Sequence, residues 1–135
     1  MDDARAWVDR LVAATNAHDV EALVACFAED YRNVTPVHPS RGFSGREQVR
    51  RNWEQIFAAV PDIRTDVVAC VVDGPTVWTQ WEMRGTRADG TLHQMAGVVI
   101  FETDGVAARK ATFFLEPVDD GGGSVDEAVR AQVVR

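Results

Sequence analysis

The stretch VWTQWEMRGTRADGTLHQMAGVVIF, residues 77–101, decides the fold. It contains most of two strand-like runs, 76–87 and 91–102, separated by the turn residues ADG, a pattern typical of a β-hairpin. In the first run the odd-numbered residues, among them Trp81 and Met83, are more apolar than the even-numbered ones. Because side chains alternate between the two faces of a strand, we expect the odd-numbered set to face the protein interior.

The sequence before this hairpin has helical periodicity, and Pro61 marks the change to strand periodicity. Apolar residues recur at helical spacing in three segments, and Asp19 is a candidate N-cap for the second of them. Helices are expected at 3–16, from Asp19 to about residue 30, and at 45–60. Strands are expected at 31–36, 62–73, 76–87, 91–102 and 106–118.

Helices followed by an antiparallel meander indicate the α+β class. Such a sheet is strongly twisted and curved, so three helices packed on its hollow side would leave a cone with an internal cavity. We assign residues 1–118 to this single domain. Residues 119–135 form an acidic, glycine-rich tail that either folds as a short helix or stays loose.

Composition excludes several functions. The chain has 135 residues, of which 46% are apolar and 26% charged, as in one soluble globular domain. Its net charge of −7 argues against nucleic acid and membrane surfaces as partners, since those binders need clustered cations. Cys26 and Cys70 lie in apolar contexts that predict buried thiols and a cytoplasmic location. The three histidines lack ligand spacing, so neither a metal nor a cofactor is expected.

Four segments of the chain, 11–31, 45–63, 77–105 and 113–118, together resemble the SnoaL-like branch of the nuclear transport factor 2-like (NTF2-like) superfamily. The resemblance runs from about residue 5 to 118 and implies an NTF2-like, cystatin-like fold. The superfamily includes polyketide cyclases, ketosteroid isomerases, epoxide hydrolases, dehydratases and non-catalytic binding domains. Fold alone therefore does not fix function.

The catalytic groups of these relatives are largely missing. The isomerases use a tyrosine on the first helix, a basic aspartate and a second carboxyl, and the resemblance places these on Leu11, Thr35 and Gly97. The Arg-x-Asp of the epoxide hydrolases is absent from the first hairpin strand. Thr112 stands where hydrolases and cyclases carry an acid on the last strand.

The remaining candidates for acid–base chemistry are few. His93 should face inward beside Met95, and its ordinary pKa of about 6.5 suits proton transfer at neutral pH. Glu82 is the alternative acid if the strand register is shifted by one residue. Tyr31, expected at the end of the second helix, would point its hydroxyl into the cavity mouth. Each of these residues also has a purely structural interpretation, as a wall, interface or packing side chain.

The predicted substrate-binding side chains are mostly large and apolar. They would line the cavity or simply fill the core, where each contributes roughly 1.5–3 kcal/mol. His38 lies in a proline-bounded loop that would cover the cavity mouth. The apolar candidates are Trp53, Phe57, Trp81, Met83, Met95, Phe113 and Leu115.

Three functions remain open at this point. The first is a cofactor-free cyclase, isomerase, dehydratase or hydrolase acting on a small apolar or polyketide-like molecule. The second is a module that binds such a molecule without turnover. The third is a dimeric accessory protein with a filled cavity. Trp78 on the outer sheet face favours a homodimer through that face in each case.

Overall fold

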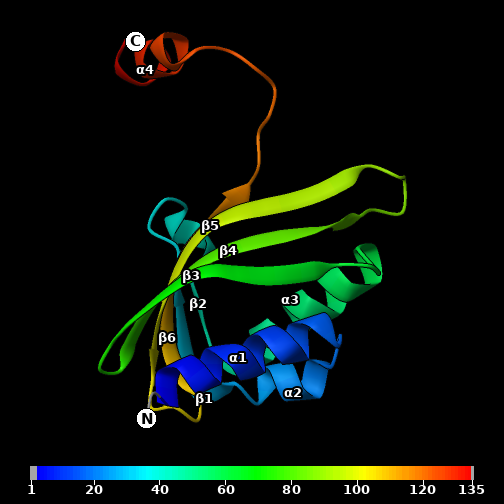
Figure 1. Cartoon of the computed structure of the whole chain (residues 1–135), viewed down its shortest axis with the longest axis vertical. Coiled ribbons are helices and arrows are strands. Elements are labelled where there is room, and N and C mark those ends of the chain that lie inside the picture. The colour runs from blue at the N-terminus through cyan, green and yellow to red at the C-terminus, as the bar shows by residue number, and fades with distance from the viewer. Residues whose placement is uncertain (1–2, 135) are drawn as a thin grey trace.

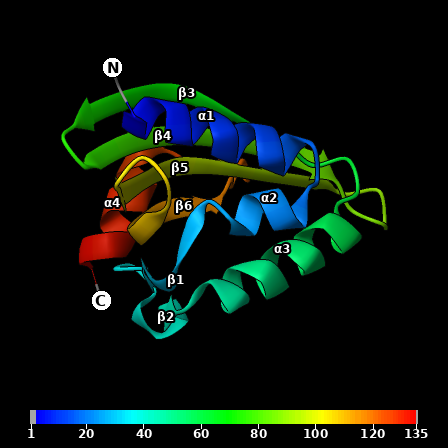
Figure 2. The same ribbon diagram turned by 90° about the horizontal axis from the view of Figure 1, so that it is seen from below.

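Helices α1 (Asp3–Asn16) and α3 (Arg46–Ala59) form where apolar side chains repeat at helical spacing. They pack with the short helix α2 (Val20–Val24) on one face of a curved sheet (Figures 1 and 2). The computed structural model describes residues 3–134. The predicted arrangement of three helices on a curved sheet is thereby confirmed.

The sheet has six strands in the order β2-β1-β6-β5-β4-β3. Neighbouring strands run antiparallel, except that β1 and β6 are parallel. The sheet therefore curves without closing, and β2 and β3 are its edges. The strands are β1 (Phe27–Val34), β2 (Phe43–Ser44), β3 (Arg64–Asp73), β4 (Thr76–Thr86), β5 (Leu92–Thr103) and β6 (Ala108–Pro117).

The hairpin of β4 and β5 has the predicted register. Met83 pairs with Met95, and Gly85 pairs with His93. Along β4 the odd-numbered residues are buried and the even-numbered ones are exposed, so the inner face was assigned correctly. Trp78 lies on the outer face, where 52% of its surface is exposed.

Gly97 permits a close approach between β5 and β6. Its φ of 149° lies in a region that favours glycine. A Cβ at this position would lie 2.1 Å from the carbonyl oxygen of Phe114 on β6. No side chain fits there, so glycine is required at this close approach of β5 and β6.

The second helix is shorter than predicted, and its expected C-terminal half belongs to strand β1. Asp19 caps α2 as expected. The carbonyl of Cys26 accepts a 2.8 Å hydrogen bond from the backbone N–H of Ala108 at the start of β6. Phe27 and Tyr31 therefore lie on a strand, because pairing with β6 overrides the helical spacing of their apolar neighbours.

The interior is filled under α1 and hollow under α3. Trp7 is fully buried, and its indole N–H donates a 2.9 Å hydrogen bond to the carbonyl of Cys26. Its ring packs edge-on against Phe27 and Phe101. These aromatic rings fill the region under α1, and the open space lies between α3 and the sheet.

Helix α4 (Val125–Val133) follows the glycine-rich segment and stands away from the sheet (Figure 1). Ser124 caps it by accepting a hydrogen bond from the N–H of Glu127. The tail segment thus contains a short helix. The predicted boundaries 1–118 and 119–135 also include residues 1, 2 and 135, which lie outside the described part of the chain. No helix within residues 3–134 is long and apolar enough to cross a membrane.

Candidate functional site

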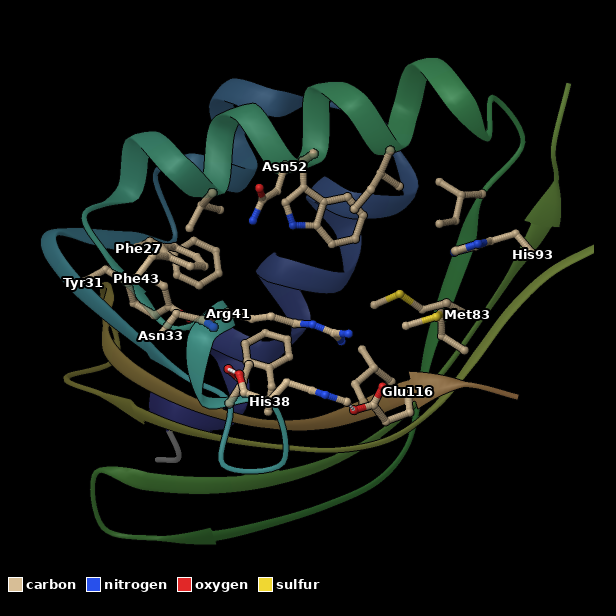
Figure 3. A pocket seen from close by; sticks show the side chains of 18 residues that line it. Phe27, Tyr31, Asn33, His38, Arg41, Phe43, Asn52, Met83, His93 and Glu116 are labelled. Atoms are coloured by element: carbon tan, nitrogen blue, oxygen red, sulfur yellow. Dashed lines mark hydrogen bonds and ion pairs between the residues drawn. The ribbon is translucent and has the colours of Figure 1, made fainter. Parts of the chain in front are cut away.

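A cavity of about 320 Å³ lies between α3 and the inner face of the sheet. Helix α3 contributes positions with helical spacing to it, and strands β1, β4, β5 and β6 contribute the opposite wall. The loop 35–42 borders its open side (Figure 3). The apolar lining residues are Phe27, Phe43, Val49, Trp53, Ile56, Ile63, Met83, Met95, Phe113 and Leu115.

Most of the residues predicted for the site do line this cavity. They come from five different elements and one loop, so only the fold brings them together. The eight are Tyr31, His38, Trp53, Met83, His93, Met95, Phe113 and Leu115.

Three predicted site residues lie elsewhere. Phe57 on α3 stacks on His18 at a centroid distance of 4.5 Å and does not line the cavity. Trp81 lines a separate space of about 40 Å³ deeper in the core, and its indole N–H donates to Thr79 Oγ1. Glu82 is exposed on the outer sheet face, because the predicted register is the observed one. It is no longer a candidate acid.

His38 and Glu116 are in hydrogen-bonding contact at the cavity mouth. His38 Nε2 lies 2.7 Å from Glu116 Oε1. Both side chains are partly exposed, at 35% and 41%. A carboxylate oxygen accepts, so Nε2 donates this bond, and in the neutral form of the ring the lone pair is on Nδ1.

Arg41 projects into the same mouth from the 3-10 turn η1 (Pro39–Arg41) (Figure 3). The turn is held by hydrogen bonds from the N–H of Arg41 to the carbonyl of His38 and from Thr35 Oγ1 to that same carbonyl. Side chains three residues apart in a 3-10 turn eclipse one another. His38 and Arg41 therefore point to the same side, which is the cavity.

Tyr31 and Asn33 form a buried pair on the inner face of β1. The Tyr31 hydroxyl donates a 2.7 Å hydrogen bond to Asn33 Oδ1. Burial raises the pKa of this hydroxyl well above its ordinary value, so it does not release a proton near neutral pH. Because Oδ1 is occupied, the amide nitrogen of Asn33 is directed into the cavity (Figure 3).

Asn52 on α3 presents a second amide nitrogen to the cavity. Gln48 Nε2 donates a 2.8 Å hydrogen bond to Asn52 Oδ1, which orients the Asn52 amide in the same way. Within residues 3–134 every fully buried side-chain nitrogen or oxygen has a hydrogen-bond partner, so a side-chain nitrogen without a partner is not fully buried. The two amide nitrogens are therefore donors open to the cavity.

His93 lies at the end of the cavity away from Asn33 and Tyr31 (Figure 3). Arg87 Nη2 is 3.5 Å from His93 Nδ1. A guanidinium can only donate, so Nδ1 accepts and Nε2 carries the proton. Burial first, and then the positive charge of Arg87, lower the pKa of His93 below its ordinary value. The ring is therefore neutral at pH 7.

Four polar lining residues were not found from the sequence: Asn33, Arg41, Asn52 and Glu116. Asn52 falls between Val49 and Trp53 on the apolar side of α3, and this spacing could have indicated it. Strand alternation would place Glu116 outward with Phe114. The side chain of Glu116 reaches the mouth because it lies near the end of β6, beside loop 35–42 (Figure 3).

No group of three or more histidine, cysteine or acidic side chains in the described part of the chain is arranged to hold a metal ion.

Residues 8–109 match the family of SnoaL-like domains. The chain belongs to the SnoaL-like domain family. No significant match was found among curated proteins.

Solved structures agree on the fold of this SnoaL-like protein. AclR of Streptomyces galilaeus, a proposed hydroxylase, has a TM-score of 0.76 at 14% identity, covering 99% of this chain and 95% of that one. A proposed ketosteroid isomerase from Kribbella flavida has a TM-score of 0.69 at 23% identity, with 99% and 89% covered. An NTF2-like protein of unknown function from Exiguobacterium has a TM-score of 0.67 at 21% identity, with 84% and 98% covered.

The three positions on which the resemblance placed the isomerase groups have structural roles here. Leu11 is a buried core residue. Thr35 lines the cavity, but its hydroxyl is used to hold the loop through the carbonyl of His38. Gly97 has no room for a side chain. Any acid–base chemistry in this cavity therefore has to use other residues.

Proposed function

We propose that this SnoaL-like protein binds a small, largely apolar carbonyl compound and moves protons on it without a cofactor, as an isomerase, cyclase or dehydratase does. A cavity of about 320 Å³ lies at the lower end of the range for small-molecule sites. Its walls are mostly apolar, with a few polar groups that would orient the ligand.

The observation that carries the proposal is the His38–Glu116 pair, with its 2.7 Å contact. The carboxylate fixes the tautomer in which Nδ1 accepts a proton, and its negative charge stabilises the imidazolium that results. In the proposed step a C–H bond beside the carbonyl breaks and the proton passes to Nδ1. The electron pair moves to the carbonyl oxygen, and the imidazolium then returns the proton to another atom of the substrate.

The oxygen that gains charge needs donors aimed at it. The amide nitrogens of Asn33 and Asn52 face the cavity with their carbonyl oxygens already engaged. Neutral His93, with its proton on Nε2, is a third donor at the other end. We assign His38 the role of base and these three residues the role of hydrogen-bond donors.

Solvent exchange tests the proposal without knowledge of the natural substrate. In D2O the protein should accelerate deuterium uptake beside the carbonyl of 1-tetralone, followed by proton NMR. A positioned base contributes about 10²–10⁴-fold, so His38→Ala should lose about 100-fold or more of the acceleration. Glu116→Gln should lose about tenfold of the acceleration, because the imidazole ring of His38 is then held less firmly.

Glu82→Gln is the matched control, since it removes an exposed carboxylate from the outer face of the sheet. It should keep the full rate. Exchange by the unaltered protein at the buffer rate would refute the proposal. Equal rates in His38→Ala and the unaltered protein would remove His38 from the mechanism.

Ligand binding without turnover is a second candidate, and the mostly apolar walls of the cavity favour it. A carrier would bind 1-tetralone with no exchange above the buffer rate.

We further propose that the protein is a homodimer through the outer face of the sheet. Val71 pairs with Trp78, which pairs with Ile100, so the three form an apolar row across β3, β4 and β5. Val71 and Trp78 are 66% and 52% exposed. Contiguous apolar surface of this kind is typical of interfaces.

A further inference from the structure

We propose that Arg41 binds a carboxylate of the ligand, so that the substrates of this cavity are aromatic or alicyclic acids of about one or two rings. The inference rests on the proposed function, because it names the substrate class of the same cavity. It assigns the acid end of the ligand to the mouth and the apolar end to the interior.

The first support is the position of Arg41. Its side chain reaches from η1 into the cavity (Figure 3). It forms no hydrogen bond or ion pair with another described residue of the chain. The turn that carries it is braced by the bonds of Thr35 and His38. The turn therefore fixes the backbone of Arg41, and the five donors of its guanidinium are unused by the described residues.

The second support is charge. Among the described residues that line the cavity, Glu116 is the single carboxylate, and its oxygen is bound to His38. The other titratable lining groups are Tyr31, which stays protonated, and neutral His93. Arg41 thus has no carboxylate partner of its own among these residues, and the carboxylate of a ligand would supply one.

A carboxylate fits this position better than a phosphate. The guanidinium fork matches a planar carboxylate with two parallel hydrogen bonds. A phosphate dianion carries two negative charges, and Glu116 at the cavity mouth carries another. The single positive charge of Arg41 would not balance them. The chain's net charge of −7 adds to that repulsion.

The size of the cavity limits the rest of the ligand. A volume of about 320 Å³ is at the small end of ligand-binding cavities, which favours a compact ligand of one or two rings. Trp53, Met83 and Met95 provide flat and adaptable apolar surface for a ring. With its carboxylate at Arg41, the ligand would present a carbon near the acid group to His38, which lies on the same side of the turn.

Calorimetric titration with a matched pair of probes tests the inference. 2-Naphthylacetic acid and its methyl ester have the same rings and differ in charge. The unaltered protein should bind the acid about tenfold or more tightly than the ester, since a charge-assisted hydrogen bond contributes about 1.5–3 kcal/mol. Arg41→Gln should remove this preference, because it weakens binding of the acid and leaves the affinity for the ester unchanged.

Arg41→Lys keeps the charge without the fork and should retain part of the preference. Arg84→Gln is the control, because Arg84 is an exposed cation on the outer face of β4. It should bind both probes as the unaltered protein does. Unchanged ester binding by Arg41→Gln also shows that this variant is folded.

The outcomes separate the two proposals. Equal affinity for acid and ester, or a preference that survives in Arg41→Gln, overturns the carboxylate assignment and leaves the proposed function standing. A preference for the acid together with no exchange of 1-tetralone overturns the catalytic proposal and leaves the assignment standing. Failure to bind either probe overturns the carboxylate assignment, and the exchange of 1-tetralone then decides the proposed function by itself.

Discussion

Replacement of Tyr31 by phenylalanine removes one atom from the core of the site. The Tyr31 hydroxyl donates to Asn33 Oδ1 at 2.7 Å, and Tyr31 is 1% exposed. The ring itself packs edge-on against Phe27 and Phe43, and those contacts are kept. The change therefore leaves a buried carbonyl oxygen without its donor. It should lower the free energy of unfolding by about 1–3 kcal/mol.

Urea unfolding followed by tryptophan fluorescence measures this loss. With a slope of about 1–3 kcal/mol per molar urea, the midpoint should fall by roughly 1 M. Asn33→Leu in the Tyr31→Phe background removes the stranded oxygen as well. Replacing both partners by apolar groups is close to neutral, so the double variant should regain most of the stability. The cycle should give a coupling energy of about 0.5–3 kcal/mol.

The single change Tyr31→Phe should also weaken the binding of 1-tetralone, because the Asn33 amide is no longer held with its nitrogen toward the cavity. A midpoint within experimental error of the unaltered protein would refute the reasoning. So would a double variant that is less stable than Tyr31→Phe, since the two side chains would then not act as a pair.

Three further predictions follow from single contacts. Gly97→Ala should destabilise the fold by several kcal/mol and lower the melting temperature by more than about 5 °C, because its Cβ would lie 2.1 Å from the Phe114 carbonyl oxygen; near-native melting would contradict the tight approach. Trp78→Glu should shift the protein from dimer to monomer in sedimentation analysis, whereas a monomeric unaltered protein would refute the interface. NMR titration should give His93 a pKa below about 6.5, because burial and Arg87 both lower it. Arg87→Gln should raise that pKa only in part, since burial is the larger cause, and an unchanged value would exclude the contact.

The pKa of His93 also has a consequence for stability. Because folding lowers the pKa of His93, the unfolded chain binds the proton more readily. The contribution of His93 to stability is therefore fully present above the ordinary pKa of about 6.5. It is lost as the pH falls through the lowered pKa of the folded state.

The hairpin shows how much of the fold could be predicted. Its two-residue alternation placed Trp81 and Met83 inward and Trp78 outward, and the structure has the same faces. Such patterns are local and periodic, so they can be read without knowledge of the partner elements. The order of helices and strands also follows from local periodicity.

The second helix shows where this reading fails. Phe27 has the spacing of a buried helical residue, yet it begins strand β1. The reason is the pairing of β1 with β6, which lies about eighty residues further along the chain. Local propensity is weak compared with a ladder of backbone hydrogen bonds and the burial that accompanies it.

The sequence by itself determined the α+β class, the faces of the central hairpin and half of the apolar cavity wall, because alternation and helical spacing record which side chains avoid water. Tertiary structure alone decided which polar groups meet in the cavity. His38 and Glu116 are distant in sequence and join only because loop 35–42 lies against the end of β6 (Figure 3). A hydrogen bond depends on placement within a few tenths of an ångström, and no sequence periodicity encodes distances of that kind.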